Sequence, residues 1–214
     1  MNLKLIFLII LGVVSIVYLI TLKFKPGVFQ FILKGLLMPV ILCIYIFGIG
    51  TADIFWPVVL ALVFAWIGDI LLLKITNILW FKLGLASFLI GHIFYCIAMY
   101  GFIRPFNILA FVISVIIAAS FGVFIFKYIK PSKQMKIPVI AYEAIIMVMV
   151  IFALQLFLSQ MSLFGALVFA GSLCFVTSDT LLALKTFRRK KFYFAVMITY
   201  IAAQLLITLG FCLA

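Results

Sequence analysis

Acidic residues are scarce in this chain of 214 residues, which has four Asp and Glu against 16 Lys and Arg and a single His. Charged residues of all kinds make up 9% of the chain and hydrophobic residues 70%. A soluble domain has about 25% charged and about 45–50% apolar residues. The shortage of charge excludes an ordinary soluble domain. Because the apolar excess extends along the whole chain, we expect a polytopic membrane protein.

The sequence also lacks the motifs of several common chemistries. It has no GxSxG motif for a nucleophilic serine and no phosphate-binding P-loop. Its four cysteines lie in apolar runs and form no CxxC pair, which disfavours a disulfide framework and a zinc site and favours buried small side chains. These cysteines are Cys43, Cys96, Cys174 and Cys212.

Eight apolar runs are long enough for membrane-spanning helices, because an α-helix needs about 20 apolar residues to cross about 30 Å of hydrocarbon. The runs cover residues 3–22, 28–49, 53–73, 77–100, 106–126, 137–158, 162–184 and 193–213. The first run is longer than the apolar part of a typical signal peptide and has no small-residue cleavage site after it, so we interpret it as a span. The predicted fold is an all-α polytopic membrane protein with eight transmembrane helices in one membrane domain, residues 1–214.

The net charge of +12 would suit a nucleic-acid partner, but the positive-inside rule explains it more simply. Twelve basic residues lie in alternate loops, against Lys4 and Arg104 in the others. The twelve are Lys23, Lys25, Lys74, Lys127, Lys130, Lys133, Lys136, Lys185, Arg188, Arg189, Lys190 and Lys191. This bias places the basic loops in the cytoplasm and both termini outside. We expect a protein of the bacterial plasma membrane, in contact with membrane lipids and not with nucleic acid.

Two pairs of similar segments suggest an internal duplication. GDILLLK at 68–74 is echoed by SDTLLALK at 178–185, and the Lys-Pro pair at 25–26 by the one at 130–131. The offsets, 110 and 105 residues, predict two four-helix repeats, 1–104 and 105–214, related by an axis along the membrane normal. Chance similarity between Leu-rich segments is the competing interpretation.

Asp69 and Asp179 stand out because each lies inside an apolar run, where a charged side chain costs roughly 2.5–3.5 kcal/mol. Helical rise places both about 7–9 Å from the cytoplasmic edge, Glu143 about 10 Å and Lys34 about 13 Å from it. Four ionisable groups should therefore share one layer. Lys34 has two simpler interpretations, extension toward the interface or neutralisation of a carboxylate, and Glu143 has one, a structural partner for Lys34. Two isolated carboxyl groups serve packing poorly.

Further polar residues lie on single helix faces, which predicts a common interior that is either a site or a pathway. Gly84, Phe88, His92 and Tyr95 share one face of the fourth span, and Tyr200 and Gln204 share one face of the eighth. A core histidine that is simply hydrogen-bonded is the default interpretation of His92, since there is no second histidine for a metal site. Tyr95 and Gln204 also suit ordinary hydrogen bonds between helices.

Taken together, these segments resemble the YhhN-like family of membrane proteins, which includes the lysoplasmalogenases. The matching pieces are Lys34 with Pro39, GDILLL at 68–73, GLASFLIGHIFY at 84–95, Tyr142, the segment 165–187 and YIAAQLLI at 200–207. The resemblance implies hydrolysis of the vinyl ether bond of a lysoplasmalogen, a lysophospholipid, to a fatty aldehyde and a glycerophosphoethanolamine or glycerophosphocholine. No metal or organic cofactor is expected.

The residue types suit this chemistry, because vinyl ether cleavage needs a proton donor and a carboxylate that stabilises a cation, as glycoside hydrolysis does. Our hypothesis makes Asp69 and Asp179 this catalytic pair, with their acid and base roles unassigned. The resemblance implies a pocket formed by Lys34, His92, Tyr95, Tyr142, Glu143, Ser178, Tyr200 and Gln204. Two alternatives stay open: a small proton-coupled lipid or metabolite transporter, and a non-catalytic membrane scaffold.

Overall fold

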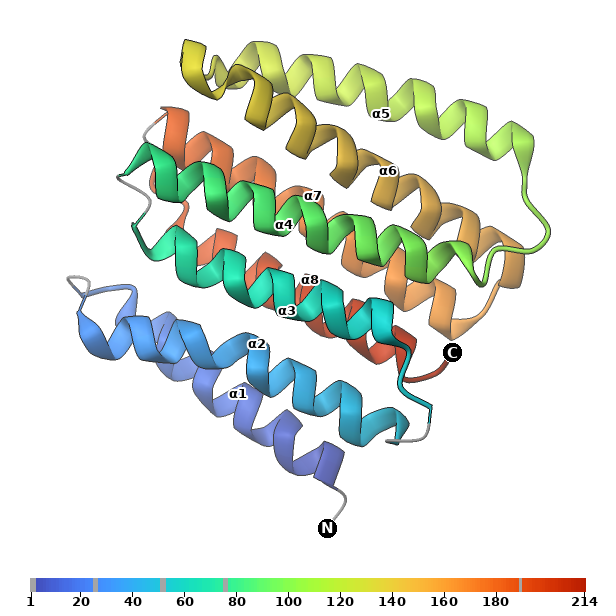
Figure 1. The fold of residues 1–214 in the computed structure, drawn as a ribbon, viewed down its shortest axis with the longest axis horizontal. Helices are drawn as coiled ribbons and strands as arrows, with labels where there is room; N and C mark the ends of the chain where they lie inside the picture. The colour runs from blue at the N-terminus through green and yellow to red at the C-terminus, as the bar shows by residue number, and fades with distance from the viewer. Residues whose placement is uncertain (1–2, 25–26, 51–52, 75–76, 189) are drawn as a thin grey trace.

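The computed structural model describes residues 3–24, 27–50, 53–74, 77–188 and 190–214 (Figure 1). Over these residues the regular structure is helical, with eight α-helices and two short 3₁₀ helices. The α-helices are α1 (Leu3–Thr21), α2 (Val28–Ile49), α3 (Trp56–Leu71), α4 (Ile78–Tyr100), α5 (Ile108–Ile129), α6 (Lys136–Gln160), α7 (Leu163–Arg188) and α8 (Tyr193–Phe211). The 3₁₀ helices are η1 (Leu72–Lys74) and η2 (Lys133–Met135). The eight predicted spans are thus confirmed as eight helices.

Local sequence signals account for several helix ends. The side chain of Asn77 accepts a hydrogen bond from the backbone N–H of Leu79 at the start of α4, and Asn107 caps α5 in the same way through the N–H of Ala110. At α3, Pro57 occupies the first turn, where its missing N–H costs nothing, so this helix begins at Trp56, three residues later than predicted. The apolar run predicted that α7 ends at residue 184. The helix continues through its basic residues to Arg188.

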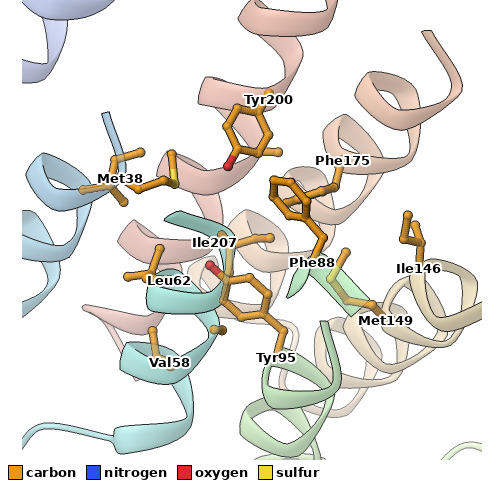
Figure 2. Packing of buried hydrophobic residues seen from close by; sticks show 14 of the residues in the cluster. Met38, Val58, Leu62, Phe88, Tyr95, Ile146, Met149, Phe175, Tyr200 and Ile207 are labelled. Atoms are coloured by element: carbon orange, nitrogen blue, oxygen red, sulfur yellow. The ribbon is translucent and has the colours of Figure 1, made fainter. Parts of the chain in front are cut away.

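Six helices form a closed ring in the order α2, α3, α4, α6, α7 and α8, in which each packs against the next and α8 returns to α2. All six contribute to the hydrophobic core, as the labelled side chains of Figure 2 show. The other two helices lie outside the ring, α1 against α2 and α8, and α5 against α6 and α7 (Figure 1). Their position explains why only 11% of the residues in the apolar stretch of α1 or α5 are buried inside the protein, whereas 56% are buried in the corresponding stretch of α4 or α8.

Glycines bring neighbouring ring helices close together. A Cβ at Gly91 on α4 would lie 3.1 Å from the carbonyl oxygen of Ala61 on α3, and one at Gly171 on α7 would lie 2.9 Å from that of Ala203 on α8. Small residues at such crossings let backbones approach, which is how helices associate when no water is present to drive apolar surfaces together. The α3–α4 and α7–α8 pairs are therefore the closely packed units of the ring.

The ring order is unchanged when every helix number is shifted by four. The series α2, α3, α4 then becomes α6, α7, α8, and the outer helix α1 becomes the outer helix α5. Two repeats spanning 1–104 and 105–214 would produce this order. The division into repeats remains a prediction from the sequence, and the helix order accommodates it.

The outer surface is apolar around much of the bundle. Ile108 and Leu109 on α5 are 72% and 71% exposed, and similar side chains cover α1. Seven of the helices are long and apolar enough to cross a membrane, and α3, with 16 residues, is shorter. Together these features indicate an integral multi-pass membrane protein.

The helix ends carrying the basic residues gather at one end of the bundle. Each odd-numbered helix leads into the next even-numbered one at that end, and the two termini lie at the other (Figure 1). Arg188 at the end of α7 donates a hydrogen bond to the carbonyl oxygen of Tyr128 near the end of α5, at 2.7 Å. Of the twelve basic loop residues, Lys25 and Arg189 lie outside the described residues. The cytoplasmic placement of this end stays a prediction.

Candidate functional site

Asp69 lies near the end of α3 inside the ring, where it is 3% exposed. Both of its carboxyl oxygens are occupied by donors from other helices. The ammonium of Lys34 on α2 lies 3.3 Å from Oδ1. The hydroxyl of Tyr200 on α8 donates a hydrogen bond to Oδ2 at 2.7 Å. A buried carboxylate is tolerated when it is paired and hydrogen-bonded in this manner, so the arrangement explains how an acid can lie in this core.

Glycines hold α3 and α4 together beside this ion pair. A Cβ at Gly68, next to Asp69, would lie 2.6 Å from the ring of Phe88 on α4, and one at Gly84 would lie 2.6 Å from Leu72. The two glycines belong to the GDILLL and GLASFLIGHIFY segments, so part of these segments serves close packing rather than chemistry.

Asp179 on α7 is half-buried and has different partners. The hydroxyl of Tyr142 on α6 donates a hydrogen bond to its Oδ2 at 2.9 Å. Among the side chains that the structure describes, no cation forms an ion pair with Asp179. The two aspartates therefore occur in similar sequence contexts but differ in their neighbours.

A pocket between α4, α5, α6 and α7 reaches Asp179 and does not include Asp69. Its polar lining consists of Tyr142, Glu143, Asp179 and Thr180. The remaining lining is apolar: Phe81, Leu85, Ile129, Val139, Ile146, Met147, Val176, Leu182, Ala183 and Phe187. Its volume is about 50 Å³. Ligand pockets typically measure roughly 300–1,000 Å³, so a lipid chain can enter only if the lining side chains move apart.

Aromatic rings connect the two carboxyl groups across the core. Tyr200, the donor to Asp69, packs edge-on against Phe175 with 5.7 Å between ring centroids (Figure 2). Phe175 in turn packs against His92 at 4.5 Å, and His92 against Tyr142, the donor to Asp179, at 5.7 Å. These ring contacts link the tyrosine donors of the two carboxyl groups, although α3 and α7 lie on opposite sides of the ring.

Three of the predicted pocket residues serve as links within the core. His92 is 1% exposed, and its Nδ1 lies 2.6 Å from the carbonyl oxygen of Phe88, so Nδ1 carries the proton. The hydroxyl of Tyr95 donates a hydrogen bond to Oε1 of Gln204 at 2.7 Å and joins α4 to α8. These are the hydrogen-bonded core histidine and the interhelical bond that the sequence offered as simpler interpretations.

Ser178 lies outside the pocket, because its hydroxyl donates to the carbonyl oxygen of Val196 at 3.0 Å and ties α7 to α8. Glu143 is not paired with Lys34, whose ion-pair partner is Asp69. The proposed structural role of Glu143 as the partner of Lys34 is therefore wrong. Glu143 shares the pocket with Asp179 instead.

The structure thus places eight of the ten predicted residues, all except His92 and Ser178, in three groups: Lys34, Asp69 and Tyr200; Tyr142, Glu143 and Asp179; and Tyr95 and Gln204. Phe175, which connects the first two groups, was missed from sequence. The sequence feature that could have identified Phe175 is its position four residues before Asp179, because residues four apart lie on one face of a helix such as α7. Among the described residues, no three His, Cys, Asp or Glu side chains are grouped so that they could hold a metal ion.

Comparisons with known proteins agree with the resemblance seen in the sequence. The model of the YhhN family matches residues 29–211, which includes every residue of the three groups. No curated protein and no solved structure is significantly similar to the chain.

Proposed function

We propose that this chain, which belongs to the YhhN family, is a membrane-embedded hydrolase that cleaves the vinyl ether bond of lysoplasmalogens. The products are a fatty aldehyde and a glycerophosphoethanolamine or glycerophosphocholine. The main support is one observation: two carboxyl groups whose tyrosine donors are linked by ring contacts occupy one core, one paired with an ammonium and the other lining an apolar pocket.

The reaction requires the chemistry that two such groups can supply. A vinyl ether is cleaved when an acid protonates its outer alkene carbon, which leaves an oxocarbenium cation on the carbon attached to oxygen. A nearby carboxylate stabilises that cation, and water adds to give a hemiacetal, which collapses to aldehyde and alcohol. In this proposal Asp69 and Asp179, which are each bonded by a side chain of another helix, supply the acid and the carboxylate.

The apolar wall of the pocket suits the alkenyl chain of the substrate. The pocket lies between helices whose outer faces are apolar, so a chain can approach from the lipid without entering water. The polar head would then lie toward the end of the bundle where the basic residues gather. Lys185, whose ammonium lies 4.2 Å from the ring centroid of Tyr193, belongs to that end.

Fatty aldehyde release by the purified protein in detergent tests this function. Replacing either aspartate by asparagine should lower the rate at least about 100-fold, the usual contribution of a general acid or base. Asp53→Asn is the matched control, because it makes the same chemical change at an exposed acid outside the site. Circular dichroism and gel filtration should show that all three variants are folded. Full turnover by both Asp69→Asn and Asp179→Asn would refute the proposal.

A proton-coupled transporter is the second candidate, favoured by buried polar atoms deeper in the core. Nε2 of His92, Nε2 of Gln204 and Oγ1 of Thr208 are buried without a hydrogen-bond partner in the described protein. Such atoms are commonly served by water, and a water-filled path would suit proton movement. Transport predicts activity that requires sealed vesicles, whereas the hydrolase releases aldehyde in detergent.

A further inference from the structure

We propose that the two aspartates carry one negative charge and one proton between them: Asp69 is the ionised member, held by Lys34, and Asp179 is the protonated member, which presents its proton to the pocket. The division of charge stands on the contacts alone. The catalytic consequence rests on the proposed function.

Access to the pocket distinguishes the two groups. Asp69 is 3% exposed, both of its oxygens have donors, and it does not line the pocket. Asp179 is half-buried and lines the pocket. Its Oδ2 accepts the hydrogen bond from Tyr142, whereas Oδ1 has no hydrogen bond within the part of the chain that the structure describes. A protonated carboxyl in this setting would accept through Oδ2 and carry its proton on Oδ1. Only Asp179 of the two can therefore reach a bound molecule.

The surrounding charges favour the same division. Asp69 is in direct contact with the ammonium of Lys34 from α2 and the hydroxyl of Tyr200 from α8, so the charged group that contacts it is a cation. The ammonium of Lys185 lies over the ring of Tyr193.

Asp179 accepts the hydrogen bond of Tyr142 and lines an apolar pocket together with the carboxyl group of Glu143. Among the described side chains no cation forms an ion pair with it, whereas Asp69 has the ammonium of Lys34. Neighbouring carboxyl groups in an apolar setting share a proton more readily than they both ionise. Of the two aspartates, the proton therefore belongs on Asp179.

This division gives a balanced route from the vinyl ether to the hemiacetal with one residue touching the substrate. Asp179 transfers its proton to the outer alkene carbon, whose π electrons form the new C–H bond, and becomes a carboxylate beside the oxocarbenium cation. The same carboxylate then takes a proton from the attacking water as the C–O bond forms, which yields the hemiacetal and restores the acid. Asp69 remains ionised and stabilises the cation at a distance. In these terms Asp179 is the catalytic residue, and Asp69 and Lys34 are positioning residues.

Infrared spectroscopy of the purified full-length protein tests the charge division without any assay of activity. The chain has four acidic side chains, of which Asp53 is exposed, so single substitutions can assign the C=O band of a protonated carboxyl. Measurements in a Glu143→Gln background remove the other pocket acid. We expect the band to vanish in Asp179→Asn. It should persist in Lys34→Met/Asp69→Asn, which removes the ion pair as a neutral unit. A band that persists in Asp179→Asn or vanishes in the double variant overturns the proposal.

The infrared spectrum of Lys34→Met distinguishes a lysine that sets the charge of Asp69 from a lysine that serves only packing. Without its ammonium, Asp69 should take up a proton, so that the spectrum shows a second protonated carboxyl that Asp69→Asn removes. Lys34→Arg should retain the spectrum of the parent protein. An unchanged spectrum in Lys34→Met would contradict the assignment.

Chemical rescue separates the catalytic residue from the positioning residue. A small carboxylic acid such as formic acid can enter the space left by Asp179→Ala, because this residue lines the pocket, and should raise aldehyde release at least about tenfold. Asp69→Ala should show no rescue, because its site is sealed. Rescue of Asp69→Ala alone would reverse the roles. If the protein released no aldehyde at all, the proposed function would fail while the infrared result still decided the charge division.

Discussion

The two aspartate centres share one kind of contact and differ in the side chain that makes it. In each half of the chain, the aspartate on the third helix is bonded by a side chain from the second helix of that half. Lys34 on α2 serves Asp69, and Tyr142 on α6 serves Asp179. The partners precede their aspartates by 35 and 37 residues. An ammonium in one half and a phenol in the other make two similar centres electrostatically unequal. A pair of identical centres would have no member set apart as the acid.

We expect the largest effect when Lys34 and Tyr142, the partners of the two aspartates, are exchanged. In Lys34→Tyr/Tyr142→Lys the ammonium moves from Asp69 to Asp179, and the phenol moves the opposite way. We expect the pocket acid to lose its proton and aldehyde release to fall at least about 100-fold. Infrared spectra should then assign the protonated carboxyl to Asp69. A double variant that keeps both its activity and its original spectrum would show that the partners do not set the charges.

Removal of the ammonium alone should have the next largest effect, on stability. Lys34→Met removes one partner of a buried ion pair, which typically costs about 3–5 kcal/mol, because Asp69 must then stay unpaired or take up a proton. Thermal unfolding in detergent should show the loss, and Lys34→Met/Asp69→Asn should recover much of it because no unpaired charge remains. Lys34→Arg serves as the control that keeps the charge. Additive losses in the double variant would mean that the two side chains do not interact.

The two tyrosines sharpen the comparison, because each donates one hydrogen bond to one aspartate. A hydrogen bond to a charged group contributes about 1.5–3 kcal/mol and a neutral one about 0.5–1.5 kcal/mol. We therefore expect Tyr200→Phe to destabilise the protein more than Tyr142→Phe does, as measured by unfolding of the two variants under identical conditions. Each substitution removes only a hydroxyl, so each is the control for the other. Equal losses would argue against different charge states of Asp69 and Asp179.

Glu143→Gln should have the smallest effect. Glu143 lines the pocket but has no cation partner among the described side chains, and glutamine keeps its size. We expect aldehyde release within about tenfold of the parent rate, below the loss that removal of a general acid causes. Steady-state rates of Glu143→Gln and Asp179→Asn, measured side by side, make the check. A larger loss in Glu143→Gln would make Glu143 the pocket acid.

Much of the site could be anticipated from sequence, although its pairings could not. The layer containing Lys34, Asp69, Glu143 and Asp179 followed from helical rise, and the structure brings Lys34 against Asp69 and Glu143 into the pocket of Asp179. The carboxyl group that Lys34 neutralises was nevertheless left open by the sequence, with Glu143 as one interpretation, and the structure shows that it is Asp69. Depth along a helix is encoded by position in an apolar run, but the identity of the neighbouring helix is not.

The role of Ser178 shows the same limit on a smaller scale. It directly precedes Asp179, so from sequence it belongs to the site. On an α-helix, however, adjacent residues point about 100° apart. Asp179 consequently faces the pocket while Ser178 faces α8 and bonds to Val196. A resemblance between segments transfers both residues, and only the packing of α7 separates their functions.

The sequence by itself determined the number of helices, their approximate ends and the positions of the acidic residues along them. Hydropathy suffices for these because a run of about 20 apolar residues has few other stable arrangements. The tertiary structure alone decided the ring order, the pairing of Lys34 with Asp69 and the opening of the pocket at Asp179. Helices in an apolar setting carry no polar outer face that marks their orientation, so which side of each helix meets which neighbour is settled by close packing and by a few buried polar contacts.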